Sequence, residues 1–153
     1  LNYDYLWIRL RVKGGAYGCM SGFGRDGVCY MVSYLDPKLA ETNEVYDKLQ
    51  EYLEQFDQDE RSMDRYVIGA ISEMDIPKNP AALGVRGLTA YLSGITREQL
   101  QKERDEVIDT DAKEIRALVP YAKAVLSNNC LCVVGNENKI KENSSLFTTV
   151  RSL

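Results

Sequence analysis

The chain has 153 residues, 44% of them hydrophobic and 27% charged, a composition typical of a globular protein with a single core. Its 19 basic and 23 acidic residues are interspersed and leave a net charge of −4, so we expect no surface for nucleic acid or for an anionic membrane. No apolar run reaches the roughly 18 residues of a membrane-spanning helix. The lack of histidine excludes a Ser-His or Cys-His nucleophile pair.

The first element predicted along the chain is a short helix with one apolar face. The residues of that face recur at three- and four-residue spacing: Tyr3, Leu6, Trp7 and Leu10. Gly14 and Gly15 then supply the permissive backbone that lets the helix end and the chain turn into a strand. Arg11 and Tyr17 are thereby held on either side of a tight junction. By spacing alone this pair has an ordinary explanation, because a helix C-terminus favours a cation and a strand favours Tyr.

An antiparallel hairpin is predicted at residues 17–35. Asp26-Gly27, between two β-rich runs, is a typical two-residue hairpin loop. That loop would set Phe23 opposite Tyr30. One face would then carry the larger side chains: Tyr17, Cys19, Phe23, Tyr30, Val32 and Tyr34. The other face would carry Met20 and several glycines, whose missing side chains would let a helix lie close.

Stripes of apolar residues at helical spacing predict a series of helices after the hairpin. They cover about residues 39–56, 63–74, 81–92, 96–108 and 111–125. Asp36 and Pro37 would provide the N-cap and first residue of the first of them. Thr96 begins a capping box with Gln99. Pro120 should kink or restart the last helix.

The four cysteines all lie in predicted strands, Cys19 and Cys29 in the hairpin and Cys130 and Cys132 in a short buried strand at 130–134. Four cysteines could hold zinc or form two disulfides, but their spacing fits neither a zinc ribbon nor a finger. We therefore interpret them as small core residues in a reducing compartment, and we expect no metal site in this chain.

The string Arg11-Val12-Lys13-Gly14-Gly15-Ala16-Tyr17-Gly18, preceded by Leu6-Trp7, resembles the C-terminal region of the pitrilysin/insulinase (M16) zinc metallopeptidases. The resemblance is closest to the presequence-protease branch, subfamily C of that family, and runs over roughly residues 5–135. Later stretches follow in the same order as in that branch: Ser33–Pro37, Tyr46-Asp47, Ile68-Gly69, Met74–Pro77 and Gly94–Glu98.

The resemblance implies an α/β (α+β) fold, an antiparallel sheet with helices packed on one face. Residues 1–153 would form a single domain, the greater part of the last, non-metal-binding α/β unit (LuxS/MPP-like) of a longer polypeptide. We expect this unit to be incomplete, with further strands preceding residue 1. The first residue is Leu rather than Met, which agrees with a fragment.

Zinc peptidases of this family need an H-x-x-E-H motif, which a chain without histidine cannot supply. The resemblance instead implies that Arg11 and Tyr17 assist a zinc site on the N-terminal catalytic half of the same polypeptide. Arg11 would bind the carbonyls of an unfolded peptide substrate and Tyr17 would donate to the oxyanion, with Gly14 and Gly15 as substrate-binding residues of the turn. This chain would hold no cofactor, would help to close the catalytic chamber, and would be inactive alone.

Three hypotheses about function remain open at this point. The chain belongs to an active oligopeptidase, to a catalytically inactive homologue that serves as a scaffold or peptide-binding module, or to an unrelated α/β binding domain. The presence of both Arg11 and Tyr17 favours the active enzyme, because an inactive homologue would be free to lose them. We expect a cytoplasmic protein, or one of the mitochondrial matrix in a eukaryote.

Overall fold

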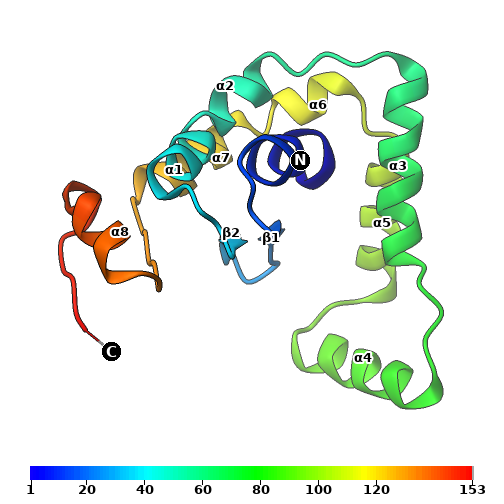
Figure 1. Ribbon diagram of the computed structural model, residues 1–153. Helices are drawn as coiled ribbons and strands as arrows, with labels where there is room; N and C mark the ends of the chain where they lie inside the picture. The colour runs from blue at the N-terminus through cyan, green and yellow to red at the C-terminus, as the bar shows by residue number, and fades with distance from the viewer. Residues whose placement is uncertain (153) are drawn as a thin grey trace. The chain divides into compact units, whose positions relative to one another are not determined.

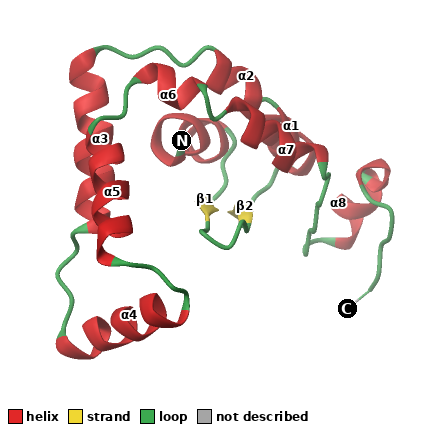
Figure 2. Cartoon of the chain, turned by 180° about the vertical axis from the view of Figure 1, so that it is seen from behind, coloured by secondary structure: helices red, strands yellow, loops and turns green. Residues whose placement is uncertain are grey.

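A computed structural model describes residues 1–152 and shows an α+β chain that divides into two compact units. The first unit joins Leu1–Gln55 to Leu118–Leu153, and the second is Phe56–Ala117. Within residues 1–152, one two-stranded antiparallel sheet accompanies many helices (Figure 2). No helix in this part of the chain is long and apolar enough to cross a membrane.

The first unit contains the hairpin and most of the buried side chains. Its elements are η1 (Asn2–Lys13), β1 (Gly18–Phe23), β2 (Cys29–Tyr34), α1 (Leu39–Asp47), α2 (Leu49–Glu54), α7 (Val119–Ser127), α8 (Glu137–Glu142) and the 3-10 turn η2 (Ser144–Leu146) (Figure 1).

The core of the first unit forms where η1 packs on the hairpin, together with side chains from α2 and α7. Its buried residues are Tyr5, Leu6, Leu10, Ala16, Leu49 and Ala122. Cys19 of β1 and Met31 of β2 pack against this cluster from one face of the hairpin. The Tyr5 hydroxyl joins η1 to α1, because it donates to the Val45 carbonyl at 2.6 Å. The predicted α+β class, an antiparallel sheet with helices on one face, is confirmed.

The helix η1 is a π-helix, which the apolar periodicity did not predict. Its hydrogen bonds span five residues, as where the Leu6 N–H donates to the Leu1 carbonyl at 3.1 Å. Residues five apart therefore share a face, and Tyr5 and Leu10 are both 1% exposed. The prediction that Tyr3 belongs to the apolar face is wrong, since Tyr3 is 80% exposed.

The hairpin loop is longer than the two residues predicted. Gly27 has a φ of +82°, whereas Asp26 keeps a negative φ. A two-residue type I′ loop would need a positive φ at both positions. The register is therefore shifted by one residue, and Phe23 pairs with Cys29 instead of Tyr30.

The shifted register changes which side chains share a face. Tyr34 pairs with Gly18 and Tyr30 pairs with Gly22. A Cβ on either glycine would overlap the ring of its partner, so the two rings cover the glycines. The predictions that a helix lies on the glycine face, and that Cys19 shares a face with the tyrosines, are both wrong. Cys19 points to the core instead.

The helix predicted over residues 39–56 begins differently and is divided. Lys38 is the N-cap of α1, so the prediction of Asp36 as N-cap is wrong by two residues. Asp36 still supports the first turn, because its carboxylate accepts from the Lys38 N–H at 2.9 Å and from the Thr42 hydroxyl at 2.6 Å. An interruption at Lys48 separates α1 from α2.

Residues 130–134 form no strand, contrary to the prediction. Cys130 and Cys132 are exposed, so their interpretation as core residues is wrong, whereas Cys19 and Cys29 lie partly buried in strands. A strand needs a neighbour to take up its N–H and C=O groups, and within residues 1–152 no segment pairs with this one. All four thiols are free.

The second unit is helical. Its elements are α3 (Glu60–Met74), α4 (Pro80–Leu92), α5 (Arg97–Ile108) and α6 (Ala112–Arg116), with α3 and α5 side by side (Figure 1). The predicted capping box from Thr96 to Gln99 is present at α5, and a second box joins Asp111 to Glu114 at α6. Pro120 restarts the chain as α7, one of the two outcomes predicted for it.

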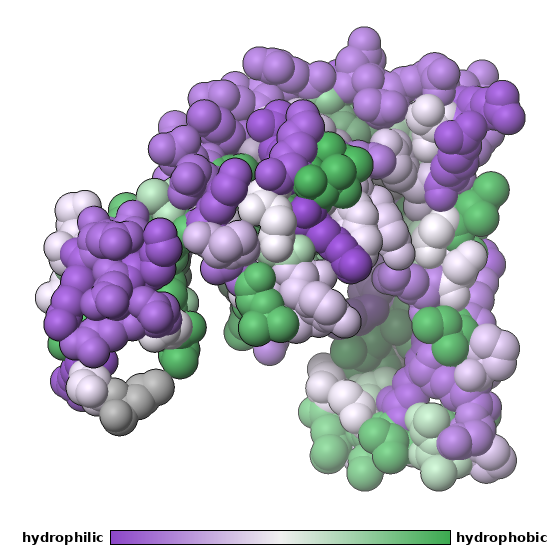
Figure 3. Space-filling model, in the orientation of Figure 1, coloured by the Kyte–Doolittle hydropathy of each residue, from purple (hydrophilic) through white to green (hydrophobic). Residues whose placement is uncertain are grey.

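Helix α4 presents an apolar surface to solvent. Leu83, Val85, Leu88, Tyr91 and Leu92 are each more than half exposed, Tyr91 to 83%. Figure 3 shows this apolar surface over α4. No residue of α4 is buried by the part of the chain that the structure describes.

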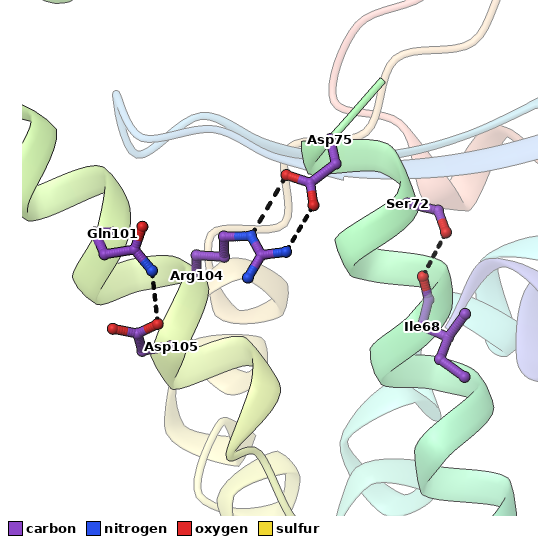
Figure 4. Close-up of polar contacts among 6 residues, drawn as sticks. All are labelled: Ile68, Ser72, Asp75, Gln101, Arg104 and Asp105. Carbon is purple, nitrogen blue, oxygen red and sulfur yellow. Dashed lines mark hydrogen bonds and ion pairs between the residues drawn. The ribbon is translucent and has the colours of Figure 1, made fainter. Parts of the chain in front are cut away.

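An ion pair joins α3 to α5 (Figure 4). Arg104 Nη2 lies 2.7 Å from Asp75 Oδ2, and Nε lies 3.4 Å from Oδ1. These hydrogen bonds from Arg104 lower the pKa of the Asp75 carboxyl below its ordinary value. Since α3 ends at Met74 and Asp75 is its C-cap, the pair fixes the C-terminal end of α3 to α5.

We expect Asp75→Asn to lower the melting temperature slightly at neutral pH and to have no effect in strong acid. A carboxyl whose pKa is lowered by folding contributes stability above its unfolded pKa, and the contribution is lost as the pH falls through the folded pKa. The effect is small because both partners are partly exposed and solvent screens them. Thermal unfolding measured from neutral to acid pH tests this, with the exposed Asp64→Asn of the same helix as control. An equal, pH-dependent loss in both variants would contradict it.

Candidate functional site

The candidate site lies at the turn between η1 and β1, where Arg11 and Tyr17 come together. Gly14 is the C-cap of η1, and a Cβ on it would overlap the Leu10 carbonyl oxygen. Gly15 has a φ of +88°, a conformation that residues with a side chain adopt only with strain. These two glycines let the chain reverse sharply enough to bring Tyr17 back beside Arg11.

The backbone N–H groups of the turn are already occupied. Those of Gly14 and Gly15 donate to the Arg11 carbonyl, the second at 3.0 Å. The Ala16 N–H donates to the Leu10 carbonyl, also at 3.0 Å. The glycines therefore contribute shape and space to the site rather than hydrogen-bond donors.

The Arg11 guanidinium lies against two aromatic rings. Its central carbon is 4.2 Å from the centroid of the Trp7 ring and 5.6 Å from that of the Tyr17 ring, both within cation–π range. The side chain is exposed, and within residues 1–152 it makes no hydrogen bond or ion pair. A cation–π contact uses none of the N–H groups as hydrogen-bond donors to oxygen, so these groups are available to a ligand.

Tyr17 is held by its backbone and its ring, while its hydroxyl is free. The Tyr17 N–H donates to the carbonyls of Tyr34 and Leu35 at 3.2 and 3.3 Å. Its ring meets the Tyr34 ring edge-on at 5.3 Å. The side chain is 59% exposed, and the hydroxyl makes no hydrogen bond within the described part of the chain. Leu35 has a φ of +47°, so the end of β2 turns sharply at this contact.

Cys19 lies near the site but is not an activated nucleophile. Burial raises the pKa of the Cys19 thiol above its ordinary value, and the positive charge of Arg11 opposes this only in part. Nucleophilic attack needs the thiolate, which a raised pKa disfavours. The chain also has no histidine that could take the proton.

The residues of this chain do not fit a zinc site. Among residues 1–152, no three His, Cys, Asp or Glu side chains gather closely enough to hold a metal ion. The site at the η1–β1 turn offers a guanidinium and a phenol hydroxyl, both hydrogen-bond donors suited to carbonyl oxygens and to developing negative charge.

A hollow of about 320 Å³ lies in the first unit beside β2. Its lining includes Cys29, Tyr46, Leu126 and Cys130, and Asp47 is the one charged residue among the lining residues. A single carboxylate provides no acid–base pair, so the hollow does not compete with the turn as a catalytic site.

The structure brings together Arg11 and Tyr17, the two candidate residues predicted from the sequence. Their roles in binding and catalysis stay a prediction. Sequence reasoning missed the contact of Trp7 with the Arg11 guanidinium and that of Tyr34 with Tyr17. The first contact had a signal, because residues four apart on a helix are neighbours. The second depends on the strand register, which no local pattern reveals.

Known proteins similar to this chain point to one family. The family described as PreP C-terminal domain matches residues 1–135. Protein HypA of Clostridium perfringens is 46% identical over 153 residues, 100% of this chain and 16% of that protein. Presequence protease 1, chloroplastic/mitochondrial, of Arabidopsis thaliana is 31% identical over 158 residues, 100% of this chain and 15% of the relative. Presequence protease, mitochondrial, of Schizosaccharomyces pombe is 29% identical over 129 residues, 84% of this chain and 12% of the relative.

The chain thus spans about a sixth or less of the length of these relatives. The resemblance of the string around Arg11 and Tyr17 to the presequence-protease branch is confirmed by the family match over residues 1–135 and by the plant presequence protease, whose similarity extends over the whole of this chain. This chain belongs to the PreP C-terminal domain family.

Proposed function

We propose that this chain is the C-terminal, non-metal-binding domain of a zinc metalloendopeptidase of the presequence-protease branch, which degrades unfolded oligopeptides. It would form the greater part of the last α/β unit of that enzyme. One observation carries the proposal: in a member of the PreP C-terminal domain family, the exposed side chains of Arg11 and Tyr17 lie together, with the guanidinium carbon 5.6 Å from the centroid of the tyrosine ring.

In this proposal Arg11 binds the peptide before the chemistry begins. Its guanidinium carbon lies 4.2 Å from the centroid of the Trp7 ring and 5.6 Å from that of the Tyr17 ring, and within residues 1–152 its N–H groups make no hydrogen bond or ion pair. A planar set of donors suits backbone carbonyls and holds an extended peptide in register. We propose Gly14 and Gly15 as substrate-binding residues only through the turn, because a Cβ on Gly14 would overlap the Leu10 carbonyl oxygen and Gly15 has a φ of +88°.

Tyr17 acts on the charge that develops when the peptide bond is attacked. Attack turns the carbonyl oxygen into an oxyanion, and a donor aimed at that oxygen stabilises the transition state. The exposed Tyr17 hydroxyl is such a donor. No covalent intermediate with this chain is proposed, because Cys19 favours its protonated form.

The zinc ion of the family belongs, in this proposal, to the N-terminal catalytic half of the same polypeptide. When bound there, it supplies the activated water that attacks the peptide. This chain helps to close the chamber that restricts substrates to unfolded peptides. We propose a cytoplasmic location, or the mitochondrial matrix in a eukaryote; the names of the two presequence proteases include the word mitochondrial.

The 153-residue chain alone is expected to bind no stoichiometric zinc and to hydrolyse no peptide, whereas the full-length polypeptide does both. The reason is that the chain has no histidine and, within residues 1–152, no cluster of metal ligands. Metal analysis and an assay with a short unfolded peptide measure the two properties. One tightly bound zinc per isolated chain would contradict this expectation. So would hydrolysis by the isolated chain that persists after Arg11 and Tyr17 are both replaced by Ala.

The same assay distinguishes the active enzyme from an inactive homologue that serves as a scaffold or peptide-binding module. In the inactive case, the full-length polypeptide would bind the peptide without hydrolysing it. The free donor groups of Arg11 and Tyr17 favour the active enzyme over this alternative.

A further inference from the structure

Trp7 is the residue that contacts Arg11 from its own helix. The two are four residues apart in η1, and the guanidinium carbon lies 4.2 Å from the centroid of the Trp7 ring. The indole is partly buried and lies 6.4 Å from the Tyr3 ring. On the other side of the turn, the Tyr17 ring lies 5.6 Å from the same guanidinium.

A second pair in the same helix shows what sets Trp7 and Arg11 apart. The Arg9 guanidinium lies 4.8 Å from the centroid of the Tyr5 ring, at the same spacing of four residues. That ring is buried in the core, where its neighbour is Tyr52 at 4.5 Å. Arg11, by contrast, lies close to two rings, that of Trp7 in η1 and that of Tyr17, the residue before β1. Both arginines of η1 thus lie over the ring of the residue four positions earlier, but of the two only Arg11 also contacts Tyr17 beside the turn.

We propose that Trp7 is a positioning residue that holds the Arg11 guanidinium ready to bind the carbonyls of a peptide. An arginine side chain has many rotamers, and fixing one of them on binding costs affinity. A guanidinium held over an indole by a cation–π contact has already lost much of this freedom, while its N–H groups remain available as donors. This inference rests on the proposed function of Arg11.

In the full-length polypeptide, Trp7→Leu is expected to raise KM by about 2- to 30-fold, the range that corresponds to the loss of one cation–π contact. The value of kcat should change little, because Arg11 binds the substrate before and during the reaction alike. Trp7→Phe should restore most of the affinity, since Phe keeps an aromatic face. Steady-state kinetics on a short peptide measure both constants. Should Trp7→Leu fail to fold, Trp7→Met provides the same comparison with a flexible side chain of similar length.

A double-mutant cycle separates positioning from a general effect on the helix. If Trp7 acts through Arg11, Trp7→Leu should have no further effect on KM in an Arg11→Ala background. Arg9→Ala removes the other stacked cation of η1 and should leave KM unchanged.

Two results would contradict the role of Trp7 while leaving that of Arg11 intact. One is an unchanged KM in Trp7→Leu when Arg11→Ala raises KM. The other is a rise in KM on Trp7→Leu that persists in the Arg11→Ala background. An unchanged KM in Arg11→Ala itself would overturn the proposed function of Arg11, and the role of Trp7 with it.

Discussion

Replacing Tyr17 with Phe in the full-length polypeptide is expected to lower kcat by about 10²–10³ and to leave KM nearly unchanged. Phe keeps the ring and its edge-on contact with Tyr34, so the packing of the strand is preserved. Only the hydroxyl is lost, and within residues 1–152 that hydroxyl has no partner whose loss would destabilise the fold. The whole effect should therefore fall on the transition state, where the oxyanion exists.

Tyr30→Phe is the matched control for this experiment. Tyr30 is 49% exposed on the same hairpin, and its replacement also removes one hydroxyl and nothing else. It should leave kcat unchanged. Arg11→Ala should differ from Tyr17→Phe by raising KM, since its proposed contacts form before the chemistry. A folded Tyr17→Phe enzyme with normal kcat would leave Tyr17 as a structural residue only.

The hairpin shows which parts of the fold can be predicted from local sequence. Asp26 and Gly27 correctly mark the turn, and both strands lie within residues 17–35 as predicted. The loop length, however, depends on whether one or two residues take a positive φ, and an Asp-Gly pair is compatible with both. A difference of one residue reverses the faces, because side chains alternate along a strand. The tyrosines that cover Gly18 and Gly22 could therefore not be predicted.

The helix η1 shows a second limit. Apolar spacing predicts a helix there and correctly includes Leu6 and Leu10, but it assumes the α-helical period. A π-helix bonds across five residues, so Tyr5 replaces Tyr3 in the core. The composition of residues 2–13 does not distinguish an α-helix from a π-helix. Which of the two forms depends on how η1 packs against the rest of the unit.

The candidate site was more predictable than the strands because it depends on short-range features. Gly14 and Gly15 end the helix locally and let the chain turn back, which brings Tyr17 close to Arg11. A strand at 130–134, by contrast, forms only if another segment pairs with it. The residues of 130–134 themselves do not reveal whether such a segment exists. The resemblance to a family supplied the roles of Arg11 and Tyr17, which no spacing could provide.

Replacing Leu6 with Ala is expected to destabilise η1 by about 2–5 kcal/mol, the range for a buried leucine that leaves a cavity. Leu6 is 0% exposed and belongs to the cluster with Tyr5 and Leu10. The relevant quantity is the free energy of local opening, which amide hydrogen exchange of residues 2–13 reports in the full-length polypeptide. Faster exchange confined to this segment and to its packing partners is the expected result.

Val12→Ala is the control for Leu6→Ala, because it shortens a side chain of the same helix that is 65% exposed. Its effect should stay within about 0.5 kcal/mol. Leu6 makes no proposed contact with substrate, so kcat and KM of Leu6→Ala should remain normal at low temperature and fall only as η1 begins to open. Equal losses of protection in the two variants would mean that η1 is not anchored by its buried face. In that case Arg11 and Trp7 would have no rigid support from which to act.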